Sequence, residues 1–182
     1  IDPVRFITNH SSGRMGCALA RAAMLRGAEV TLIHGHMDVQ APMFVNACPV
    51  DSAAKMAEAG LKAAPQQDII IKAAAVSAYT PATTAQNKIK KADGDMSIPL
   101  RRTVDILKTL GTQKQPGQVI CGFSMETENL LENSRKKLAA KNCDMICANS
   151  LTSGAGGVGS ERNIITIITQ TGAKPLEKMT KE

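Results

Sequence analysis

A polar stretch at residues 8–16 has the residue types of a phosphate-binding turn. It reads TNHSSGRMG and runs directly into an apolar pattern with helical spacing. We expect the hydroxyls of Ser11 and Ser12 to cap a helix that begins near Arg14, while Gly13 lets the backbone approach a ligand closely. The first-turn N–H groups would then face outward at the positive end of the helix dipole, which favours an anion. An ordinary helix cap has the same residue types, so the rest of the chain must decide between the two interpretations.

Lysines form a second set of residues that suit a phosphate ligand. The basic run KIKK at 88–91 lies in a polar segment, 79–103, that is long for a loop of a compact domain unless it is functional or mobile. Lys137 and Lys141 lie four residues apart and therefore on one face of a predicted helix. Lysines near the carboxyl end of a helix are also a common structural feature, because they complement the helix dipole.

The elements that must position these residues alternate between helix and strand. Helices are predicted over 14–26, 51–63, 104–113 and 128–141, and strands over 28–34, 44–50, 68–76, 118–123 and 145–148, with a short strand near 96–100 and a C-terminal hairpin from 163–169 and 174–176. This order predicts an α/β fold with one Rossmann-like, doubly wound, mostly parallel sheet and an antiparallel C-terminal edge hairpin. We expect residues 1–182 to form a single nucleotide-binding domain.

The carboxyl ends of the predicted strands indicate where a ligand would bind. In open α/β sheets the site lies at this edge of the sheet. The apolar run 68–76 contains the small residues 73–75, against which a flat ligand could lie. Phe123 and Asn149 come at the ends of two further predicted strands. We therefore expect these strand ends to gather beside the loop at residues 8–16 in one site.

Composition and charge speak against several other functional classes. Of the 182 residues, 43% are apolar and 21% charged, as in ordinary globular domains. The net charge of +6 fits an anionic substrate, while the dispersed basic residues and an aromatic content of only 2% argue against nucleic-acid binding. The five cysteines include no CxxC pair, and the three histidines have no carboxylate or thiol at the spacing of metal ligands, so we do not expect a structural zinc site. No apolar run reaches about 18 residues, so we expect a cytoplasmic protein that does not enter a membrane.

Several separate motifs, taken in order, resemble one protein family. They are IDPVR at 1–5, TNHSSGRMG at 8–16, AAV at 74–76, KIKK at 88–91, Gly122-Phe123 with Glu126-Thr127, and Ala148-Asn149. In this order they resemble phosphopantothenoylcysteine synthetase, the ligase half of the bacterial bifunctional coenzyme A biosynthesis flavoprotein. The resemblance covers nearly the whole chain, and it favours the phosphate-binding interpretation of the first loop over an ordinary helix cap.

The resemblance implies a CTP-dependent ligase with two half-reactions. The carboxylate of 4′-phosphopantothenate attacks the α-phosphorus of CTP, which gives an acyl-cytidylate and pyrophosphate. The amine of cysteine then displaces CMP to form an amide. A carboxylate lacks a good leaving group, and linkage to CMP supplies one. Mg²⁺ on the triphosphate is expected to accompany the nucleotide.

The resemblance also implies roles for individual residues. Lys88 is expected to neutralise the charge that develops on the α-phosphate and pyrophosphate, and its loop to close over bound nucleotide. Asn9 is expected to hold the acyl-cytidylate and its tetrahedral oxyanion, with His10 and Lys90 also at the substrate. For His10 a supporting hydrogen bond is favoured over a role as base. The expected nucleotide-binding residues are Ser11, Ser12, Gly13, Ala74, Ala75, Phe123, Lys137, Lys141 and Asn149.

Two departures from the family pattern stand out. The family usually has an acidic residue two positions after the AAV motif, where this chain has Ala78. The family also has a strand and a glycine loop ahead of Asp2, and a chain that opens on Ile1 rather than methionine suggests that a segment precedes it. The resemblance further implies a homodimer, with an exchanged element near the basic loop, and fusion to or association with a flavin-dependent decarboxylase domain.

Other functions stay open from the sequence. The first is a nucleotide-binding module that has lost turnover, which the alanine at position 78 motivates. The second is an NAD(P)-binding short-chain oxidoreductase, although no Tyr-x-x-x-Lys pair surrounds Tyr79 and no acidic residue ends the second strand. Within the ligase interpretation, the sequence leaves the choice between CTP and ATP open.

Overall fold

The computed structural model describes residues 1–91, 93–126, 128–150 and 162–181. Its helices are α1 (Arg14–Leu25), α2 (Ala53–Ala63), α3 (Ile106–Thr112) and α4 (Leu130–Ala140), with a 3-10 turn at Ala64–Gln66. Its strands are β1 (Thr31–His34), β2 (Asn46–Pro49), β3 (Ile69–Lys72), β4 (Tyr79–Pro81), β5 (Leu100–Arg102), β6 (Val119–Glu126), β7 (Met145–Ser150), β8 (Arg162–Asn163), β9 (Ile165–Thr169), β10 (Ala173–Pro175) and β11 (Met179–Thr180). The glycine-rich sequence at 154–159, which is typical of a loop, lies outside the described residues.

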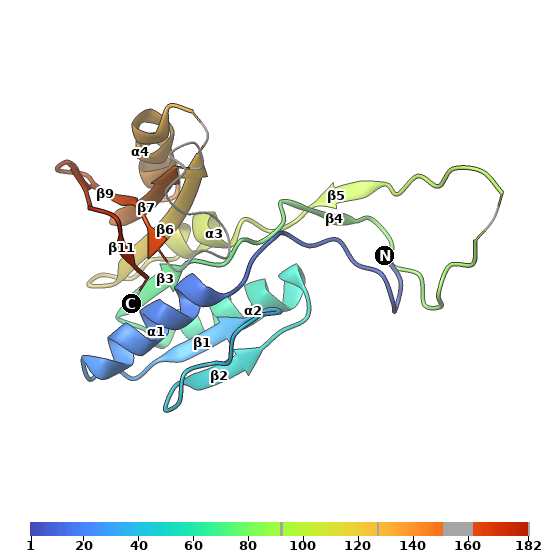
Figure 1. The fold of residues 1–182 in the computed structure, drawn as a ribbon, viewed down its shortest axis with the longest axis horizontal. Coiled ribbons are helices and arrows are strands. Elements are labelled where there is room, and N and C mark those ends of the chain that lie inside the picture. The colour runs from blue at the N-terminus through green and yellow to red at the C-terminus, as the bar shows by residue number, and fades with distance from the viewer. Residues whose placement is uncertain (92, 127, 151–161, 182) are drawn as a thin grey trace.

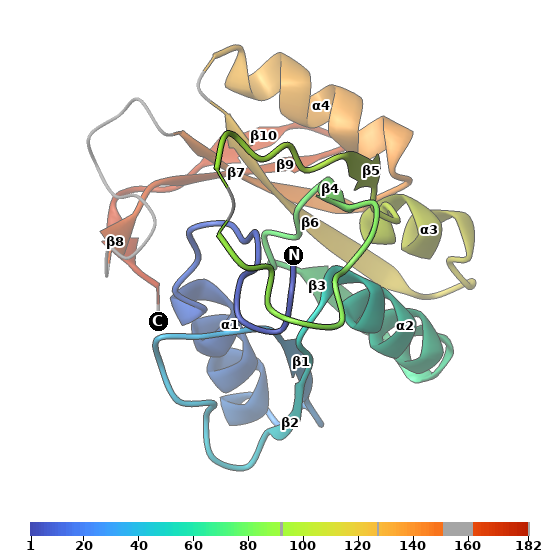
Figure 2. The ribbon, with the colours of Figure 1, turned by 90° about the vertical axis from the view of Figure 1, so that its right-hand side faces the viewer.

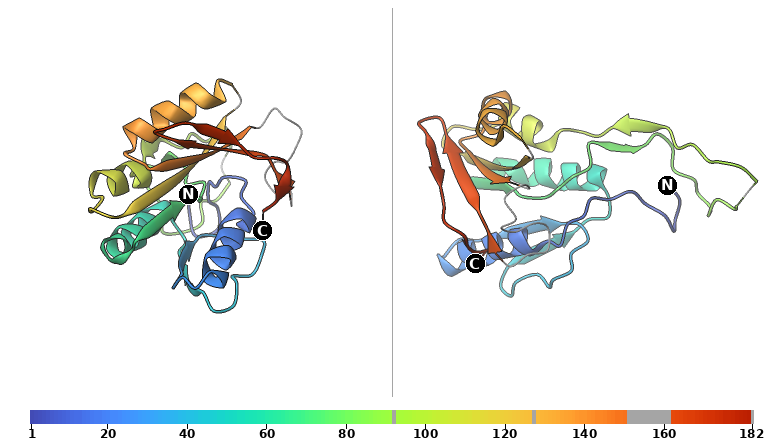
Figure 3. Two further views of the ribbon diagram at one scale, coloured as in Figure 1. Left: turned by 90° about the vertical axis from the view of Figure 1, so that its left-hand side faces the viewer. Right: turned by 45° about the horizontal axis from the view of Figure 1, so that its top comes forward.

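The principal sheet has five strands in the order β10-β9-β7-β6-β3. The pairs β3–β6 and β6–β7 are parallel, whereas β9 is antiparallel to β7 and to β10. The predicted C-terminal hairpin is therefore confirmed, and Thr169 N donates to Gly172 O at 2.9 Å in its turn. Figure 3 shows this hairpin at the edge of the sheet. The fold is mixed α/β, with a mostly parallel centre and antiparallel strands at one edge.

The prediction of one continuous sheet is wrong for the described part of the chain. β1 and β2 pair in parallel as a separate two-stranded sheet. β3 hydrogen-bonds along one side only, to β6. Because β1 does not pair with β3, the two sheets are separate. The doubly wound arrangement remains a prediction.

The core lies on one face of the five-stranded sheet. Ile120, Ile146 and Ile168 come from neighbouring strands and are completely buried. They pack in one cluster with apolar side chains of α3 and α4, among them Leu107 and Leu138. Figure 2 shows α2, α3 and α4 along this side of the sheet. Since side chains alternate between the faces of a strand, the residues between them point to the other face.

A close approach of α3 to the sheet depends on Gly122 in β6. A Cβ at this position would lie 2.7 Å from Leu107 Cδ2 and 2.9 Å from Ile146 Cδ1, closer than real contacts allow. α3 itself begins at an N-cap, Asp105, whose carboxylate accepts a hydrogen bond from Lys108 N at 3.0 Å. The sequence therefore fixes both where α3 begins and how near it packs.

Residues 77–91 and 93–104 belong to an arm that extends away from the rest of the molecule (Figure 1). At its base β4 and β5 pair antiparallel. The strand predicted near 96–100 is found instead at Leu100–Arg102, and its partner β4 was not predicted. The N-terminal segment runs beside the arm in Figures 1 and 3, and Ala85 N donates to Ile1 O at 3.0 Å.

Candidate functional site

The loop before α1 contacts the segment after β3, as the sequence predicts. Asn9 Nδ2 donates a hydrogen bond to Ala75 O at 2.6 Å. Asn9, His10 and Ala75 are exposed, and Ala74 is half-buried. The two positions that sequence analysis assigned to the substrate and to the nucleotide are thus joined by a direct contact.

The predicted capping of α1 by Ser11 or Ser12 is wrong, because Gly13 occupies the N-cap in a left-handed conformation with φ of 75°. Such a conformation favours a residue without Cβ, and a Cβ on Gly13 would lie 2.6 Å from Met37 Cγ. Ser12 is buried and its carbonyl accepts from Asp38 N at 3.1 Å, whereas Ser11 is exposed. The first turn of α1 carries no acidic residue, so its positive dipole end is not offset by a carboxylate there.

The strand ends differ from prediction at Phe123. β6 continues to Glu126, so Phe123 lies within the strand rather than at its end. Asn149 does lie near the end of β7, and it is only 8% exposed. Phe123 pairs with Cys147 and Met125 pairs with Asn149 across the parallel strands, which places Phe123 and Asn149 on the same face of the sheet.

Lys137 and Lys141 both direct their ammonium groups toward groups of the protein. Lys137 Nζ donates to Phe123 O at 2.7 Å, and Lys141 Nζ forms an ion pair with Asp105 Oδ2 at 2.5 Å. Burial lowers the pKa of Lys137, and the charge of Glu126 partly opposes that effect. The two lysines therefore share one helix face, as predicted, and they meet β6 and the N-cap of α3.

Lys72 belongs to the same group of charges, although sequence analysis did not assign it a role. It is paired with Gly122 across β3 and β6, on the face that α3 and α4 cover. Burial lowers the pKa of Lys72; the nearby cations Lys137 and Lys141 act in the same direction, and Asp105 acts against them. Its signal in the sequence is a charged residue inside an otherwise apolar strand. We call Lys72, Lys137, Lys141 and Asp105 the lysine cluster.

Asp105 has a double role that sequence analysis missed. Burial alone would raise its pKa, but the hydrogen bonds from Lys141 and from Lys108 N outweigh burial and lower it. One carboxylate thus caps α3 and balances part of the charge of the lysine cluster. The three cations face Asp105, and Glu126 also acts on Lys137, so one positive charge remains in excess, which suits an anionic ligand.

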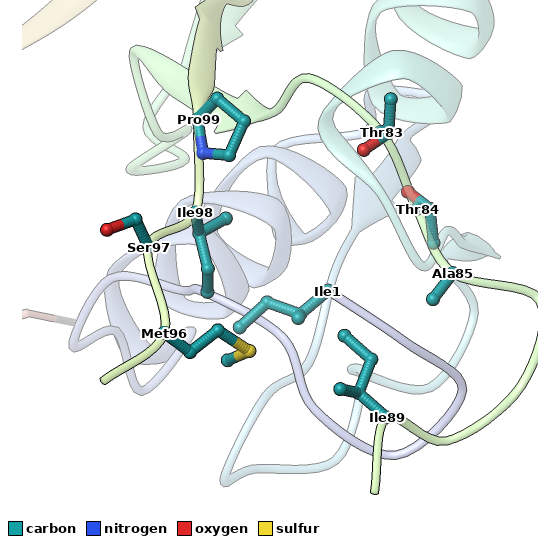
Figure 4. A pocket seen from close by; sticks show the side chains of 9 residues that line it. All are labelled: Ile1, Thr83, Thr84, Ala85, Ile89, Met96, Ser97, Ile98 and Pro99. Carbon is teal, nitrogen blue, oxygen red and sulfur yellow. The ribbon is translucent and has the colours of Figure 1, made fainter. Parts of the chain in front are cut away.

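The basic run at 88–91 lies on the arm. Lys88, Lys90 and Lys91 are exposed, while Ile89 between the first two is half-buried. Ile89 lines a hollow of about 190 Å³ together with residues 83–85, 96–99 and Ile1. Figure 4 shows this hollow, and Figure 1 shows the arm extending away from the strand ends. Within one chain, the structure therefore does not bring Lys88 and Lys90 to the other predicted site residues.

Ala78 lies at the base of the arm. Its carbonyl accepts a hydrogen bond from Thr103 N at 3.0 Å, and its residue is exposed. Within the residues that the structure describes, histidine, cysteine and carboxylate side chains do not gather in threes as they would at a metal site.

The described cysteines are free thiols, and three of the five are buried. None of the helices in the described ranges combines the length and the apolar character that crossing a bilayer requires.

The sequence matches a family model over its whole length. The model is DFP, described as the DNA/pantothenate metabolism flavoprotein C-terminal domain, and it matches residues 1–182. The chain is 49% identical over 175 residues to the coenzyme A biosynthesis bifunctional protein CoaBC of Bacillus subtilis (strain 168), which covers 96% of this chain and 43% of the relative. A cysteine/cysteine sulfinic acid decarboxylase from an unknown prokaryotic organism is also 49% identical, over 94% of this chain and 48% of that protein. The chain thus spans less than half the length of these relatives.

Solved structures resemble the fold over the whole chain. The crystal structure of the C-terminal domain of a CoaBC bifunctional protein superposes with a TM-score of 0.82 at 41% identity, covering 100% of this chain and 81% of that one. A mutant of Cab2 in complex with phosphopantothenate-cysteine has a TM-score of 0.75 at 16% identity, covering 96% of this chain and 74% of that one. The second of these shows a shared fold alone.

Proposed function

Because the chain belongs to the family of DNA/pantothenate metabolism flavoprotein C-terminal domains, we propose that it joins 4′-phosphopantothenate to cysteine in coenzyme A biosynthesis. The phosphopantothenate carboxylate attacks the α-phosphorus of CTP and expels pyrophosphate. The amine of cysteine then attacks the acyl carbon of the acyl-cytidylate and expels CMP. The name of the Bacillus subtilis relative and the ligand of the Cab2 complex support this assignment.

The hydrogen bond between Asn9 and Ala75 is the observation that carries the proposal. A primary amide has two N–H donors, and Asn9 uses one of them on Ala75 O at 2.6 Å. That bond orients the amide beside the segment after β3, and the second N–H is then a fixed donor for the acyl oxygen. A preorganised donor stabilises an oxyanion strongly because it needs no reorientation during the reaction.

The nucleotide is proposed to lie across the carboxyl ends of the strands. Phe123 and Asn149 face one side of the sheet, whereas Lys72 faces the other, with the lysine cluster. A ligand that contacts both sets must therefore pass over the strand ends rather than lie on one face. We assign phosphate to Ser11, Ser12 and the N-terminal turn of α1, and the base and ribose to the strand ends and the lysine cluster.

The arm supports a homodimer in which Lys88 acts on the site of a second copy. Lys88 lies on an extension directed away from its own strand ends (Figure 1). Apolar side chains near the base of the arm and along the adjacent N-terminal segment are exposed, with Phe6 at 75% and Leu100 at 49%. If a second copy of the chain covered these apolar side chains, Lys88 would lie against the triphosphate bound to that second copy. We propose that Mg²⁺ enters this site bound to the nucleotide. The proposal also includes fusion to, or association with, a flavin-dependent decarboxylase domain, and a cytoplasmic location.

A two-stage assay tests the assignment. In a single turnover with CTP, Mg²⁺ and phosphopantothenate but no cysteine, we expect Lys88→Ala to slow pyrophosphate release about 100-fold or more. Asn9→Ala should still release pyrophosphate, and should lose most of the amide formation that follows addition of cysteine. ATP in place of CTP identifies the preferred nucleotide. Full activity of both variants would contradict the assigned roles.

A second candidate function is nucleotide binding without turnover. It is motivated by Ala78, which places no carboxylate at the base of the arm, where the family pattern has an acidic residue. Under this alternative, calorimetry would detect CTP binding without pyrophosphate release, and Ala78→Asp would restore release. Turnover by the unchanged chain excludes the alternative.

A further inference from the structure

A short turn at the start of the chain encloses a carboxylate. The side chain of Asp2 has no exposed surface, although it lies beside the arm and far from the core cluster. Its Oδ1 accepts hydrogen bonds from Val4 N and Arg5 N, both at 2.9 Å. Its Oδ2 accepts from Arg5 Nε at 3.0 Å and from Arg5 Nη2 at 2.6 Å. Two guanidinium N–H groups thus share one carboxylate oxygen, while the other oxygen accepts the two backbone N–H groups; hydrogen bonds between charged groups are stronger than neutral ones.

This ion pair also forms hydrogen bonds with Ile89, which is more than 80 positions away in the chain. Ile89 N donates to Asp2 Oδ2 at 3.1 Å, and Arg5 Nη2 donates to Ile89 O at 2.9 Å. Both backbone groups of Ile89 are therefore held by one rigid pair. We call this arrangement the Asp2–Arg5 clamp.

The side chain of Ile89 adds an apolar anchor to the clamp. It points into the hollow of the arm, toward Ile1 and Met96 (Figure 4). Its neighbours Lys88 and Lys90 stay exposed. The clamp therefore fixes the backbone between two lysines and leaves their ammonium groups available.

Among the described residues, few other hydrogen bonds hold this part of the arm in place. The strand pairing of β4 with β5 ends at Pro81 and Leu100. Beyond it, the backbone bonds between described residues are Ala82 N to Pro99 O at 2.8 Å and Ala85 N to Ile1 O at 3.0 Å. The position of Lys88 thus depends strongly on the clamp, because long loops with few contacts lose order readily.

We propose that Asp2 and Arg5 are positioning residues for the reaction, and that their clamp on Ile89 presets Lys88 and Lys90 for the phosphates of the nucleotide. The inference rests on the proposed function, in which Lys88 stabilises charge on the transferred phosphate. A cation held in place needs no ordering at the moment of reaction, and displacement of a reacting group by about 1 Å can slow a reaction roughly 100-fold. The clamp acts through backbone position and does not touch the substrate.

A double-mutant cycle tests whether Asp2 acts through Lys88. Asp2→Asn should lower kcat for pyrophosphate release about 10- to 100-fold, with little change in the Kd for CTP measured by calorimetry, since the strand ends bind the nucleotide. In the Lys88→Ala background, the same Asp2→Asn change should have almost no further effect. Asp51→Asn is the matched control, because Asp51 forms an exposed ion pair with Lys55 at 2.7 Å on α2.

Chemical labelling gives a readout that does not depend on activity. Acetic anhydride modification, read by mass spectrometry, should show that CTP with Mg²⁺ protects Lys88 in the unchanged protein. Protection of Lys88 should be lost in Asp2→Asn and in Arg5→Lys, while protection of Lys137 persists. Arg5→Lys keeps the positive charge and serves if Asp2→Asn does not fold.

Distinct outcomes separate this proposal from the proposed function. Equal losses from Asp2→Asn with and without Lys88, or unchanged labelling of Lys88, would overturn the clamp while leaving the ligase assignment intact. Full activity of Lys88→Ala would instead remove the proposed role of Lys88 and, with it, the purpose of the clamp.

Discussion

Lys72 brings a cation to the face of the sheet that α3 and α4 cover. Burial and two neighbouring lysines lower its pKa, so its protonated form is disfavoured in the folded protein relative to the unfolded chain. The resulting loss of stability is present at neutral pH and disappears as the pH rises through the lowered pKa toward the ordinary value. A residue that reduces stability in this way is a candidate for ligand binding.

Lys72→Met is therefore expected to raise the midpoint of urea unfolding at pH 7, because it removes a buried charge. It should also weaken CTP binding about tenfold, as loss of one charge-assisted contact does. The gain in stability should shrink as the pH approaches 10. Urea titrations at pH 7 and pH 10, with calorimetry for CTP, measure both effects. Lys62→Met, at an exposed position on α2, is the control and should change neither. A destabilised Lys72→Met protein would contradict the argument.

Asp144 joins the start of β7 to the start of β6. Its Oδ1 pairs with Lys114 Nζ at 2.5 Å, and its Oδ2 accepts from Ile120 N at 2.7 Å. Burial alone would raise the pKa of Asp144, but these bonds outweigh burial and lower it. A lowered carboxyl pKa means that the stabilisation is complete above the ordinary pKa and is lost as the pH falls through the lowered value.

Asp144→Asn should lower the free energy of unfolding by about 1 kcal/mol at pH 7, a small value because the side chain is 38% exposed and solvent screens the pair. The difference from the unchanged protein should be the same at pH 7 and pH 5, and should shrink as the pH falls below the ordinary carboxyl pKa of 3.8 toward the lowered one. Urea unfolding at pH 7, 5 and 3 measures this trend. A difference that stayed constant with pH would argue against an electrostatic origin.

At the scale of elements, the distance between α3 and β6 depends on Gly122. Gly122→Ala should lower the free energy of unfolding by about 1–3 kcal/mol, as overpacking of a core does, because its Cβ would meet Leu107 and Ile146. Urea unfolding measures the loss. Gly172→Ala is the control, since no atom lies within 4 Å of a Cβ in the hairpin turn and its φ is not in the left-handed region. Equal stability of the two variants would show that α3 can move away without loss.

The sequence predicted the order of most elements, because the apolar periodicity of helices and strands depends on residues close in the chain. Apart from the C-terminal hairpin, it could not predict which strands pair. The separation of β1–β2 from the larger sheet depends on hydrogen bonds between distant residues, and so does the pairing of β4 with β5. The N-cap of α1 shows a local failure: the left-handed Gly13 displaced the serines that the preference for hydroxyl caps favoured.

The candidate site was predictable only in part for the same reason. The contact of Asn9 with Ala75 confirmed that the first loop meets the segment after β3. Lys72 was missed because its face is set by the register of β3 against β6, which no local pattern specifies. The placement of Lys88 on an arm directed away from the strand ends also lies beyond local reasoning, since it depends on how a long polar segment folds.

At the scale of the whole molecule, the arm predicts that two inactive chains can complement each other. If Lys88 acts on a second copy, a mixed dimer of Lys88→Ala and Asn9→Ala chains has one site with both residues intact. Mixing the two inactive proteins should then restore up to about a quarter of the activity of the unchanged protein, because about half of the dimers are mixed and each mixed dimer has one complete site out of two. Pyrophosphate release coupled to amide formation measures the recovery.

The control for this experiment is each variant mixed with itself, which should stay inactive. A mass measurement by light scattering must accompany it, since complementation requires exchange of subunits. Mixed dimers that form but remain inactive would mean that Lys88 serves its own chain, and the arm would then have to fold back toward the strand ends during the reaction.

The alternation of residues along β6 also limits how this segment can change in length. Gly122 sits where the Cδ atoms of Leu107 and Ile146 leave no room for a Cβ, and the next residue, Phe123, is one of the largest side chains in the chain. Deletion of a single residue before this pair would exchange the two faces and direct the phenylalanine ring into the space that only glycine fills, and insertion of one residue would place the ring on the same face, at the position of the buried Ser124. Length variation among functional relatives should therefore fall in the arm and the surface loops, and the stretch from Ile120 to Phe123 should align without gaps.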